Sequence, residues 1–421
     1  MKILLIHSSY MQRGGEDSVL AAEGQLLRAA GHTVIEYLRD NNEISGYSTL
    51  AKAVLAPRSI WAWDICRAIK HLMEKEKPDL AHFHNTFPLI SPAAYYACRK
   101  AGVPVIQTLH NYRLLCPAAT LFRNGRLCEA CLGKAFPWDG IAHACYRRSH
   151  AASAAVAMLL GVHHTLQTWT TKVNAFIAPS EFAKEKFVQG GLPAGKIFVK
   201  PNFVFPNPCP NRCGNPASHG KYAVFVGRLA EEKGLRTLLA AWKLLDGQVP
   251  LRIAGDGPLR KELEASASKL PAISFDGGLA REKVFDALEH ARFLVFPSEW
   301  YEPFGCVITE SFAFGVPVIA SRLGGIQQIV QNHVSGLLFN PGDAEDLAAK
   351  VERAWTHPKE MEVMGRYART EYETKYSAAR NYELLMDIYR RVLKDNSRLP
   401  EGTHHNGGHL EVETGVTINP P

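Results

Sequence analysis

Short apolar runs alternate with segments of helical period along the first half of the chain. Six of these runs predict buried strands: Lys2–His7, His32–Leu38, Leu80–His84, Val103–Leu109, Phe176–Ala178 and Ile197–Lys200. Each run is flanked by turn residues, and a helical stretch separates it from the next. This alternation is typical of a parallel sheet covered by helices. The pattern therefore predicts a first Rossmann-like α/β domain over residues 1–203.

The same alternation resumes after a stretch that lacks periodicity. Residues Pro201–Gly220 are rich in proline, asparagine and glycine, and we assign a linker to 204–220. Five further runs predict a second sheet: Tyr222–Val226, Pro250–Ala254, Ile273–Phe275, Phe293–Phe296 and Val316–Ala320. We therefore expect a second Rossmann-like domain over 221–375. Two doubly wound domains facing each other across a cleft would place nucleotide-type ligands at the carboxyl ends of the strands.

The end of the chain divides into a helix and a tail. Residues Pro358–Lys394 are charged and have a helical period, and we assign a C-terminal helix to 376–395. Residues 396–421 are rich in glycine, histidine and asparagine, which predicts a disordered tail. Three histidines of the tail are candidate metal ligands, but a solvated tail is the simpler interpretation.

Composition excludes several classes of protein. Hydrophobic residues make up 46% and charged residues 21% of 421 residues, which are ordinary globular values and exclude a disordered or collagen-like chain. Met1–His7 is short and is interpreted as a first strand, not as a secretory signal. No apolar run reaches the roughly 18 residues of a membrane-spanning helix. We therefore expect a cytoplasmic protein whose nine cysteines are reduced or bind a metal.

The positive charge is concentrated in the first half. The chain carries +7, but residues 1–203 hold 23 Lys and Arg against 14 Asp and Glu, a net charge of +9. This excess favours an anionic partner such as a membrane surface, a nucleic acid or a phosphorylated substrate. The basic stretch Tyr146–Arg148 precedes Ala151–Val162, which is uncharged. That segment is either a buried helix, which its alanine content favours, or a helix lying peripherally on the inner face of a membrane.

Two carboxylates in Pro297–Ala320 carry the most specific signal. Glu302 lies in the loop after a predicted strand, and Glu310 lies eight residues later in the following helix. An isolated pair of glutamates is usually a pair of solvated charges on a helix surface. Here the flanking strands and the intervening Pro-Phe-Gly favour a binding role instead. Both carboxylates are placed to bind hydroxyl groups at the carboxyl edge of the sheet.

The start of that helix supplies backbone donors. We expect the helix to begin near Pro303 and to end at Gly315. The free N–H groups at its start form a ready site for phosphate or sugar oxygens, and they belong to Phe304, Gly305, Cys306 and Val307.

Other strand-to-helix turns agree with a phosphate ligand. Gly227 allows a tight turn, and Arg228 and Lys233 would bring two cations over it, which suits a diphosphate. Gly14 and Gly15 follow the first strand and allow a ligand to approach the backbone closely.

Together these motifs resemble the retaining glycosyltransferases of family 4, also called glycosyl transferases group 1, which have the two-domain GT-B architecture. The Glu302-x7-Glu310 motif is the most specific element. The supporting stretches are Gly227–Gly234, Ala254–Pro258, Pro179–Phe182 and the glycine pair at Gly324. The resemblance implies a hexosyltransferase-type enzyme that takes a nucleotide-diphosphate sugar and needs no cofactor for catalysis.

The resemblance also implies roles for single residues. Glu302 would contact the donor sugar, Glu310 would hold the ribose hydroxyls, and Arg228 and Lys233 would neutralise the diphosphate. His110 ends the strand Val103–Leu109 and would lie near the donor sugar.

The chain departs from the family pattern at two places, and two further assignments stay open. Asn111 stands where the family often has Asp, and Gln328 stands where it often has Glu. His110 could instead be a hydrogen-bonded core group. His82 and His84 either line the acceptor cleft or are structural.

The acceptor and the competing functions are less constrained. The family's habits and the basic first half favour a glycan or lipid-linked acceptor of cell-envelope or exopolysaccharide synthesis. A nucleotide-sugar epimerase or a phosphorylase of the same fold is the main alternative. A non-catalytic scaffold is a further alternative, and a nucleic-acid-binding protein is disfavoured because the basic residues are dispersed.

Four cysteines suggest a metal site in an insertion over 116–145. Their spacing is C-x11-C-x2-C-x13-C, and they are Cys116, Cys128, Cys131 and Cys145. A C-x-x-C pair offers two thiolates on one turn, and two more would complete a tetrahedral zinc site. Such a zinc would be structural because four cysteines leave no open coordination position. The alternative is a set of independent thiols.

Overall fold

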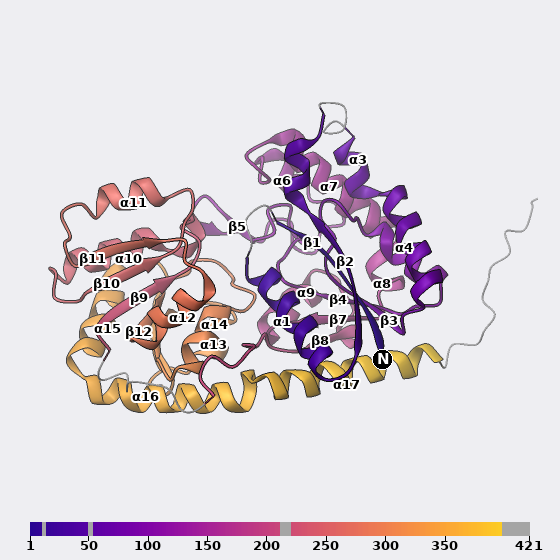
Figure 1. Ribbon diagram of the computed structural model, residues 1–421. Coiled ribbons are helices and arrows are strands. Elements are labelled where there is room, and N and C mark those ends of the chain that lie inside the picture. Colours follow the sequence, from indigo (N-terminus) through magenta and orange to yellow (C-terminus); the bar gives the residue numbers. More distant parts are fainter. Residues whose placement is uncertain (11–13, 49–53, 211–219, 398–421) are drawn as a thin grey trace, which may run out of the picture.

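The computed structural model describes residues 1–10, 14–48, 54–210 and 220–397. Two lobes, each built on a parallel six-stranded sheet, lie side by side (Figure 1). The first sheet has the order β2-β1-β3-β4-β7-β8. Its strands are β1 Lys2–Ser9, β2 Thr33–Asp40, β3 Leu80–Asn85, β4 Val105–Thr108, β7 Ala175–Ala178 and β8 Ile197–Val199.

The second sheet has the order β11-β10-β9-β12-β13-β14. Its strands are β9 Tyr222–Val226, β10 Leu251–Ala254, β11 Ile273–Gly277, β12 Ala291–Phe296, β13 Val318–Ser321 and β14 Gly336–Phe339. In both sheets the strand order reverses beside the first strand, because later strands are added on its other side. This reversal is typical of doubly wound folds. The prediction of two Rossmann-like domains is confirmed.

Helices flank both sheets. Those of the first lobe are α1 Gly15–Ala29, α3 Leu55–Ile60, α4 Trp63–Glu76, α5 Ala93–Lys100, α6 Trp138–Ala142, α7 His150–Thr165, α8 Thr168–Thr171 and α9 Glu181–Gln189. Those that follow are α10 Leu235–Leu244, α11 Arg260–Ser266, α12 Arg281–Glu289, α13 Cys306–Ala313, α14 Ile326–Ile329, α15 Ala344–Thr356, α16 Pro358–Glu371 and α17 Ala378–Ser397. Short 3₁₀ turns are η1 Asn41–Gly46, η2 Ala194–Lys196 and η4 Glu231–Lys233, and η5 Tyr372–Tyr376 is a π turn.

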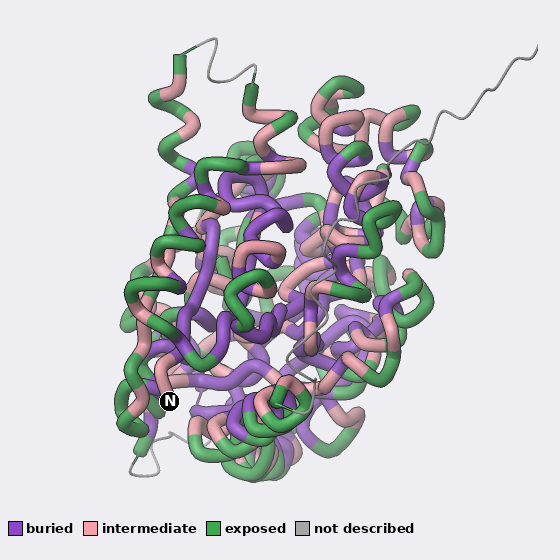
Figure 2. Tube along the Cα trace, turned by 90° about the vertical axis from the view of Figure 1, so that its right-hand side faces the viewer, coloured by how far each residue is buried: buried purple, intermediate pink, exposed green. Residues whose placement is uncertain are grey.

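Burial explains why the apolar runs form strands. Every residue of β3 is buried, and Figure 2 shows buried segments in the interior with exposed helix turns around them. β14 and a small antiparallel hairpin, β5 Phe122–Arg123 with β6 Arg126–Leu127, were not predicted. The two hairpin strands have two residues each, which is too short for a periodicity to be detected, whereas β14 is no shorter than the predicted β10.

One helix boundary was predicted wrongly. α13 begins at Cys306, not near Pro303. Gly305 is its N-cap and has a left-handed backbone with φ of +86°, so the chain turns there before it enters the helix. Pro303 and Phe304 therefore belong to the turn and not to the first helical turn.

α17 returns from the second lobe and packs beneath the first sheet (Figure 1). Its buried face joins a core cluster with Ile3, Leu5 and Leu80, and that face consists of Leu385, Met386, Ile388, Tyr389 and Val392. The helix runs to Ser397, two residues beyond the predicted end. The rest of the predicted tail, residues 398–421, lies outside the described residues, as do residues 211–219 of the predicted linker.

α7 contains the uncharged segment Ala151–Val162. It packs against α3 and α6, with one face buried and Met158 exposed on the other. Its N-cap is Ser149, whose hydroxyl accepts a hydrogen bond from the Ala152 amide. This helix is therefore largely covered by protein. In the part of the chain that the structure describes, no helix is both long and apolar enough to cross a membrane.

Candidate functional site

Glu302 lies at the carboxyl edge of the second sheet and is held in place by two neighbours. Its carboxylate accepts a hydrogen bond from Ser298 Oγ at 2.9 Å and forms an ion pair with Lys233. Lys233 Nζ also lies 5.4 Å from the centre of the Trp300 ring. Glu302 is buried, and an unpaired carboxylate there would lose free energy by desolvation. Lys233 and Glu302, which are 69 residues apart in the sequence, thus form one pair of an ammonium group and a carboxylate.

A glycine makes this pairing possible. Gly234 has φ of +67°, and a Cβ built on it would lie 1.8 Å from the Pro297 carbonyl oxygen. Only glycine lets the turn after η4 pack directly against the loop after β12. This contact brings Lys233, the preceding residue, to the loop that carries Glu302.

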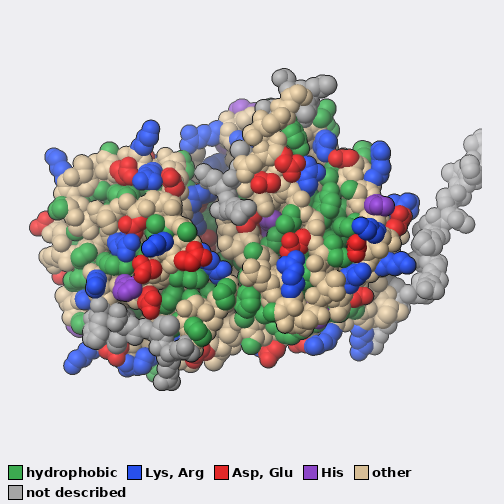
Figure 3. Space-filling model, in the orientation of Figure 1, with side chains coloured by type: hydrophobic (Ala, Val, Ile, Leu, Met, Phe, Trp, Pro, Cys, Tyr) green, Lys and Arg blue, Asp and Glu red, His purple; other side chains and the backbone are tan. Residues whose placement is uncertain are grey.

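Arg228 lies at the same strand-to-helix turn but points differently. It forms an ion pair with Glu232, and 54% of its side chain is exposed. The Gly227 amide donates to the Ala254 carbonyl at 3.0 Å, so that N–H group is used by the fold and not by a ligand. The hollow between the lobes, visible in Figure 3, has lysine and arginine side chains along its walls.

The N-terminus of α13 faces the glycine loop of the first lobe. A Cβ built on Gly15 would lie 3.6 Å from Cys306 Sγ, and Asn202 Nδ2 lies 3.4 Å from the same sulfur. A Cβ built on Gly14 would meet no atom within 4 Å. The Gly14 amide donates a hydrogen bond to the Asp17 carboxylate at 2.8 Å. The structure therefore brings the Gly14–Gly15 turn after β1 next to the start of α13.

The residues after Glu302 contribute unequally. Phe304 is buried and its ring meets Tyr376 edge to face, so its side chain belongs to the core. Gly305, Cys306 and Val307 are half-buried at the helix start. Among the residues predicted there, Phe304 can therefore serve a ligand only through its backbone.

Glu310 lies one turn inside α13 and differs from Glu302. Burial raises the pKa of the Glu310 carboxyl to about 7, and the nearby Arg281 guanidinium opposes this rise. Arg281 itself donates to the Phe205 carbonyl at 2.9 Å. A carboxyl that is neutral for part of the physiological range can donate as well as accept hydrogen bonds, which suits a pair of hydroxyl groups.

His110 ends a buried chain of polar groups. Its Nε2 lies 2.9 Å from His84 Nδ1, and His84 Nε2 lies 3.4 Å from the Glu23 carboxylate. Glu23 is paired with the Lys200 ammonium at 2.6 Å. His84 Nδ1 and His110 Nε2 share one hydrogen bond, so one of these two nitrogens carries the proton and the other accepts it. His110 thus follows the carboxyl end of β4 and is hydrogen-bonded to a buried histidine of the core.

The same chain contains a possible cation site. One ligand atom each from Glu23, His82 and His84 lies within 4.8 Å of the others. The Lys200 ammonium already neutralises Glu23, and Asn381 of α17 contacts the same ammonium at 3.2 Å. His82 bonds Thr108 and Tyr389 at 2.7 and 2.8 Å. These contacts make His82 a structural residue of the sheet.

Glu16 was missed by the sequence argument. Asn111 Nδ2 donates to Glu16 Oε2 at 3.3 Å, and Asn85 Nδ2 lies 3.4 Å from Oε1. Burial, helped by the neighbouring Asp17 carboxylate, raises the pKa of Glu16 to about 8. The available signal was a carboxylate directly after Gly14 and Gly15, at a helix start. Asn111, which replaces the family's Asp, is therefore bonded to a residue at the start of α1.

Two hydrogen bonds join the lobes beside the site. Ser180 Oγ donates to the Pro303 carbonyl at 2.9 Å, and the Phe182 amide donates to Gln328 Oε1 at 3.1 Å. Ser180 also caps α9 by accepting from the Ala183 amide. The stretch Pro179–Phe182 of the first lobe thus contacts Gln328, the residue that stands where the family often has Glu, across the boundary between the lobes.

The four cysteines of the insertion converge without forming a closed cluster. Cys116, Cys128, Cys131 and Cys145 line one small pocket, and each is a free thiol. Among the described residues, no three of these four sulfurs lie within 4.8 Å of one another. The zinc site therefore stays a prediction.

Comparisons with known proteins cover both lobes. Residues 13–207 match the family described as Glycosyltransferase Family 4, and residues 214–371 match Glycosyl transferases group 1. A sulfoquinovosyl transferase of Arabidopsis thaliana is 37% identical over 168 residues, 38% of this chain. The chain spans only about a third, 32%, of that relative.

Two longer similarities cover most of the chain. A glycogen synthase of Mycobacterium tuberculosis is 28% identical over 341 residues, which is 78% of this chain and 73% of that protein. The crystal structure of Anabaena HepE in complex with UDP-glucose superposes with a TM-score of 0.64 at 17% identity. It covers 95% of this chain and 100% of that one, which shows a shared fold.

Proposed function

The chain belongs to glycosyltransferase family 4 and has the GT-B fold, and on that premise we propose that it moves a sugar from a nucleotide-diphosphate sugar to an acceptor hydroxyl. The proposed transfer retains the anomeric configuration, as the family does. The observation that carries the proposal is the cluster of Lys233, Glu302 and the start of α13 at one sheet edge.

In the proposed mechanism the donor diphosphate replaces carboxylates as the partner of two cations. Without donor, Lys233 pairs with Glu302 and Arg228 pairs with Glu232. Diphosphate oxygens near these side chains would attract both cations and leave Glu302 free to accept from a sugar hydroxyl. The leaving group is then stabilised where its charge develops.

The helix start and the first lobe complete the donor site. The N-terminus of α13 favours an anion, and Glu310 inside the same helix binds the ribose hydroxyls. His110, oriented through His84, meets the sugar from the first lobe. The acceptor enters from the same lobe, past Glu16 and the glycine pair. The reaction needs no covalent nucleophile, since the acceptor hydroxyl attacks the face that the diphosphate leaves.

The acceptor is proposed from charge. The +9 carried by residues 1–203 favours an anionic acceptor, and a lipid-linked or polysaccharide intermediate of envelope or exopolysaccharide synthesis fits that charge. Such an acceptor would bring the protein to the inner face of a membrane as a peripheral partner. Nucleic acid is not part of the proposal.

A thermal-shift screen with UDP-, GDP- and ADP-sugars tests the donor assignment. We expect one nucleotide class to raise the melting temperature, because a ligand that binds only the folded state stabilises it. Arg228→Ala should abolish that rise. Arg366→Ala is the matched control, since Arg366 is also exposed and paired with a glutamate four residues away, but on α16. The proposal fails if none of the three classes shifts the wild type.

The same material separates the alternative activities. Incubation with the donor alone would change the sugar if the protein were an epimerase, and phosphate-dependent release of sugar phosphate would indicate a phosphorylase. We expect neither, and we expect sugar transfer to require an added acceptor.

A further inference from the structure

The insertion over residues 116–145 has little regular structure to hold it. It contains β5, β6 and the five-residue α6, and the remainder is turns. Of the eleven described non-glycine residues with a positive φ, six lie within or just after it: Ala119, Leu121, Asn124, Ala144, Arg147 and Arg148. Residues in that backbone region persist only where their surroundings fix them. The apolar side chains of Leu121, Phe122 and Leu132 pack on the core of the first lobe, and a cross-link would hold the turns between them.

The four cysteines are the only residues placed to supply a cross-link in the described insertion. They line one pocket, which we name the cysteine pocket, with Arg123 in its wall. All four are free thiols, so the insertion holds no disulfide. Arg123 Nη1 is buried there and has no hydrogen-bond partner. A buried guanidinium nitrogen without a protein partner calls for an anionic group, an ion or a water molecule beside it.

We propose that the four thiols of the cysteine pocket bind one structural zinc ion. Tetrahedral sites have zinc–sulfur distances of roughly 2.3 Å, so binding would draw the sulfurs together from their present positions, in which no three of them lie within 4.8 Å of one another. Binding Zn²⁺ releases four thiol protons and forms a complex of net charge −2, without oxidation or reduction. The Arg123 guanidinium is placed to offset that charge and to donate to a thiolate. Four protein ligands leave the metal no catalytic position.

The insertion also reaches the second lobe. A Cβ built on Gly125, at the tip of the β5–β6 hairpin, would lie 3.9 Å from Glu231 Oε1. Glu129, between two of the cysteines, pairs with Lys186 at 2.7 Å, and Lys186 Nζ lies 5.1 Å from the Tyr301 ring centre. Glu231 belongs to η4, which carries Lys233, and Tyr301 precedes Glu302. The zinc would therefore hold the hairpin against the donor loop, a consequence that rests on the proposed function.

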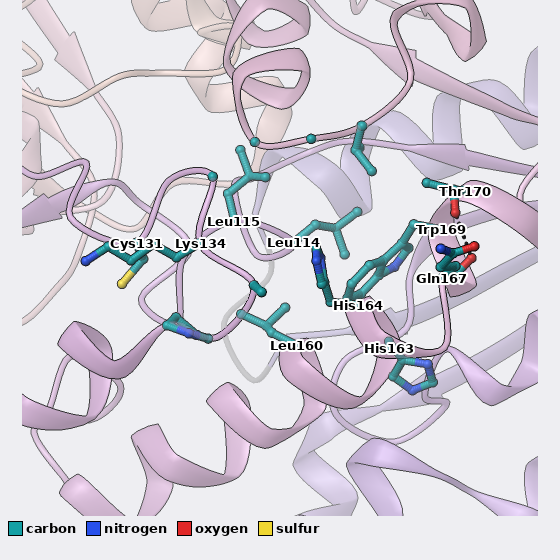
Figure 4. Close-up of a pocket in the computed structure, with 16 residues that line it drawn as sticks. Leu114, Leu115, Cys131, Lys134, Leu160, His163, His164, Gln167, Trp169 and Thr170 are labelled. Atoms are coloured by element: carbon teal, nitrogen blue, oxygen red, sulfur yellow. Dashed lines mark hydrogen bonds between the residues drawn. The ribbon is translucent and has the colours of Figure 1, made fainter.

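The other side of the insertion forms the wall of a separate cavity. This cavity has a volume of about 420 Å³ and lies within the first lobe. In Figure 4, Cys131 and Lys134 face Leu160, His164 and Trp169 across it. The segment after Cys131 thus lines this cavity, whereas the hairpin and Glu129 before Cys131 reach the second lobe.

Metal analysis of the purified full chain tests the proposal. We expect about one zinc per chain, and less than half an equivalent in Cys128→Ser/Cys131→Ser. Cys66→Ser is the matched control, because Cys66 is a half-buried thiol on α4, outside the insertion, and should leave the zinc content unchanged. A wild-type chain with less than half an equivalent, or a double variant that keeps its zinc, overturns the proposal.

A second measurement keeps the test valid if the double variant does not fold. Wild-type protein is treated with a zinc-selective chelator, and its cleavage by trypsin is followed at Arg123, Arg126 and Lys134. We expect at least tenfold faster cleavage at these sites, reversed by added zinc, with cleavage elsewhere unchanged. Unchanged cleavage after complete metal removal overturns the structural role. Both readouts are independent of the donor, so they separate this inference from the proposed function.

The link to the donor loop has its own readout. Metal removal should raise the KM for the donor more than it lowers kcat, since the hairpin positions the loop without touching the reacting atoms. An unchanged KM in a protein that loses zinc and gains trypsin cleavage would overturn the positioning role while leaving the zinc site intact.

Discussion

At the scale of single residues, the two glutamates of the E-x7-E motif are electrostatically unlike. Glu302 has the Lys233 ammonium and the Ser298 hydroxyl as partners. Glu310 is surrounded by protein, and burial raises the pKa of its carboxyl to about 7. The sequence shows both only as glutamates, because the difference comes from neighbours that are distant along the chain.

The raised pKa of Glu310 predicts a pH-dependent stability. Below the ordinary value of 4.5, the proton is bound in the folded and unfolded states alike. As pH rises toward about 7, the unfolded chain releases it first, so the free energy of unfolding falls. The full contribution is at most about 3 kcal/mol. Glu310→Gln should remove this dependence.

Urea denaturation between pH 5 and pH 8 checks this prediction. The stability of Glu310→Gln relative to the wild type should rise with pH over this range. Glu352→Gln, which changes an exposed glutamate of α15, should follow the wild-type profile. Parallel profiles for Glu310→Gln and the wild type would contradict the assignment.

At the scale of elements, α17 belongs structurally to the lobe at the other end of the chain. Its buried residues pack against β1 and β3, and Tyr389 donates to or accepts from His82 inside the first sheet. Asn381 bonds the Pro201 carbonyl at 2.7 Å, at the end of the first lobe. The first lobe is therefore completed only when the last helix is present.

A substitution in α17 should consequently destabilise the first lobe. Leu385 is fully buried, and Leu385→Ala should cost about 2–5 kcal/mol, the usual range for a truncated core leucine. Hydrogen exchange should accelerate in β1 and β3, more than 290 residues away in sequence. Arg390→Ala, on the exposed face of the same helix, should change stability by less than about 0.5 kcal/mol. Faster exchange confined to the second lobe would refute this dependence.

At the scale of the whole molecule, the site is divided between two lobes that meet through few polar contacts. Gln328 and Ser180 provide two of them, beside the loop of Glu302. The proposed donor touches both lobes, so its binding should favour a more closed arrangement.

Gln328→Ala should weaken that closure. One lost hydrogen bond corresponds to about 0.5–1.5 kcal/mol, or roughly a two- to tenfold rise in donor KM. Small-angle scattering should show a smaller radius of gyration with bound donor in the wild type, and a reduced change in the variant. Gln248→Ala, at an exposed position outside the contact, is the control. Equal compaction in all three proteins would rule out a role for Gln328.

The fold was largely predictable because strand and helix periods are local properties. Tyr222–Val226 was predicted with its observed bounds, whereas β14 was missed although it is no shorter than the predicted β10. The start of α13 was misplaced because the left-handed conformation of Gly305 is not encoded by a pattern that favours proline at helix starts. Local signals thus identify elements better than their ends.

The sequence by itself determined two α/β domains, the E-x7-E motif and the residue types at each strand end, since each depends on neighbours in the chain. The tertiary structure alone decided which groups are partners. It paired Lys233 with Glu302, connected His110 through His84 to Glu23, placed α17 under the first sheet and set the cysteine insertion against the donor loop. Partnerships and pKa shifts depend on burial and on distances across the fold, which no local pattern contains.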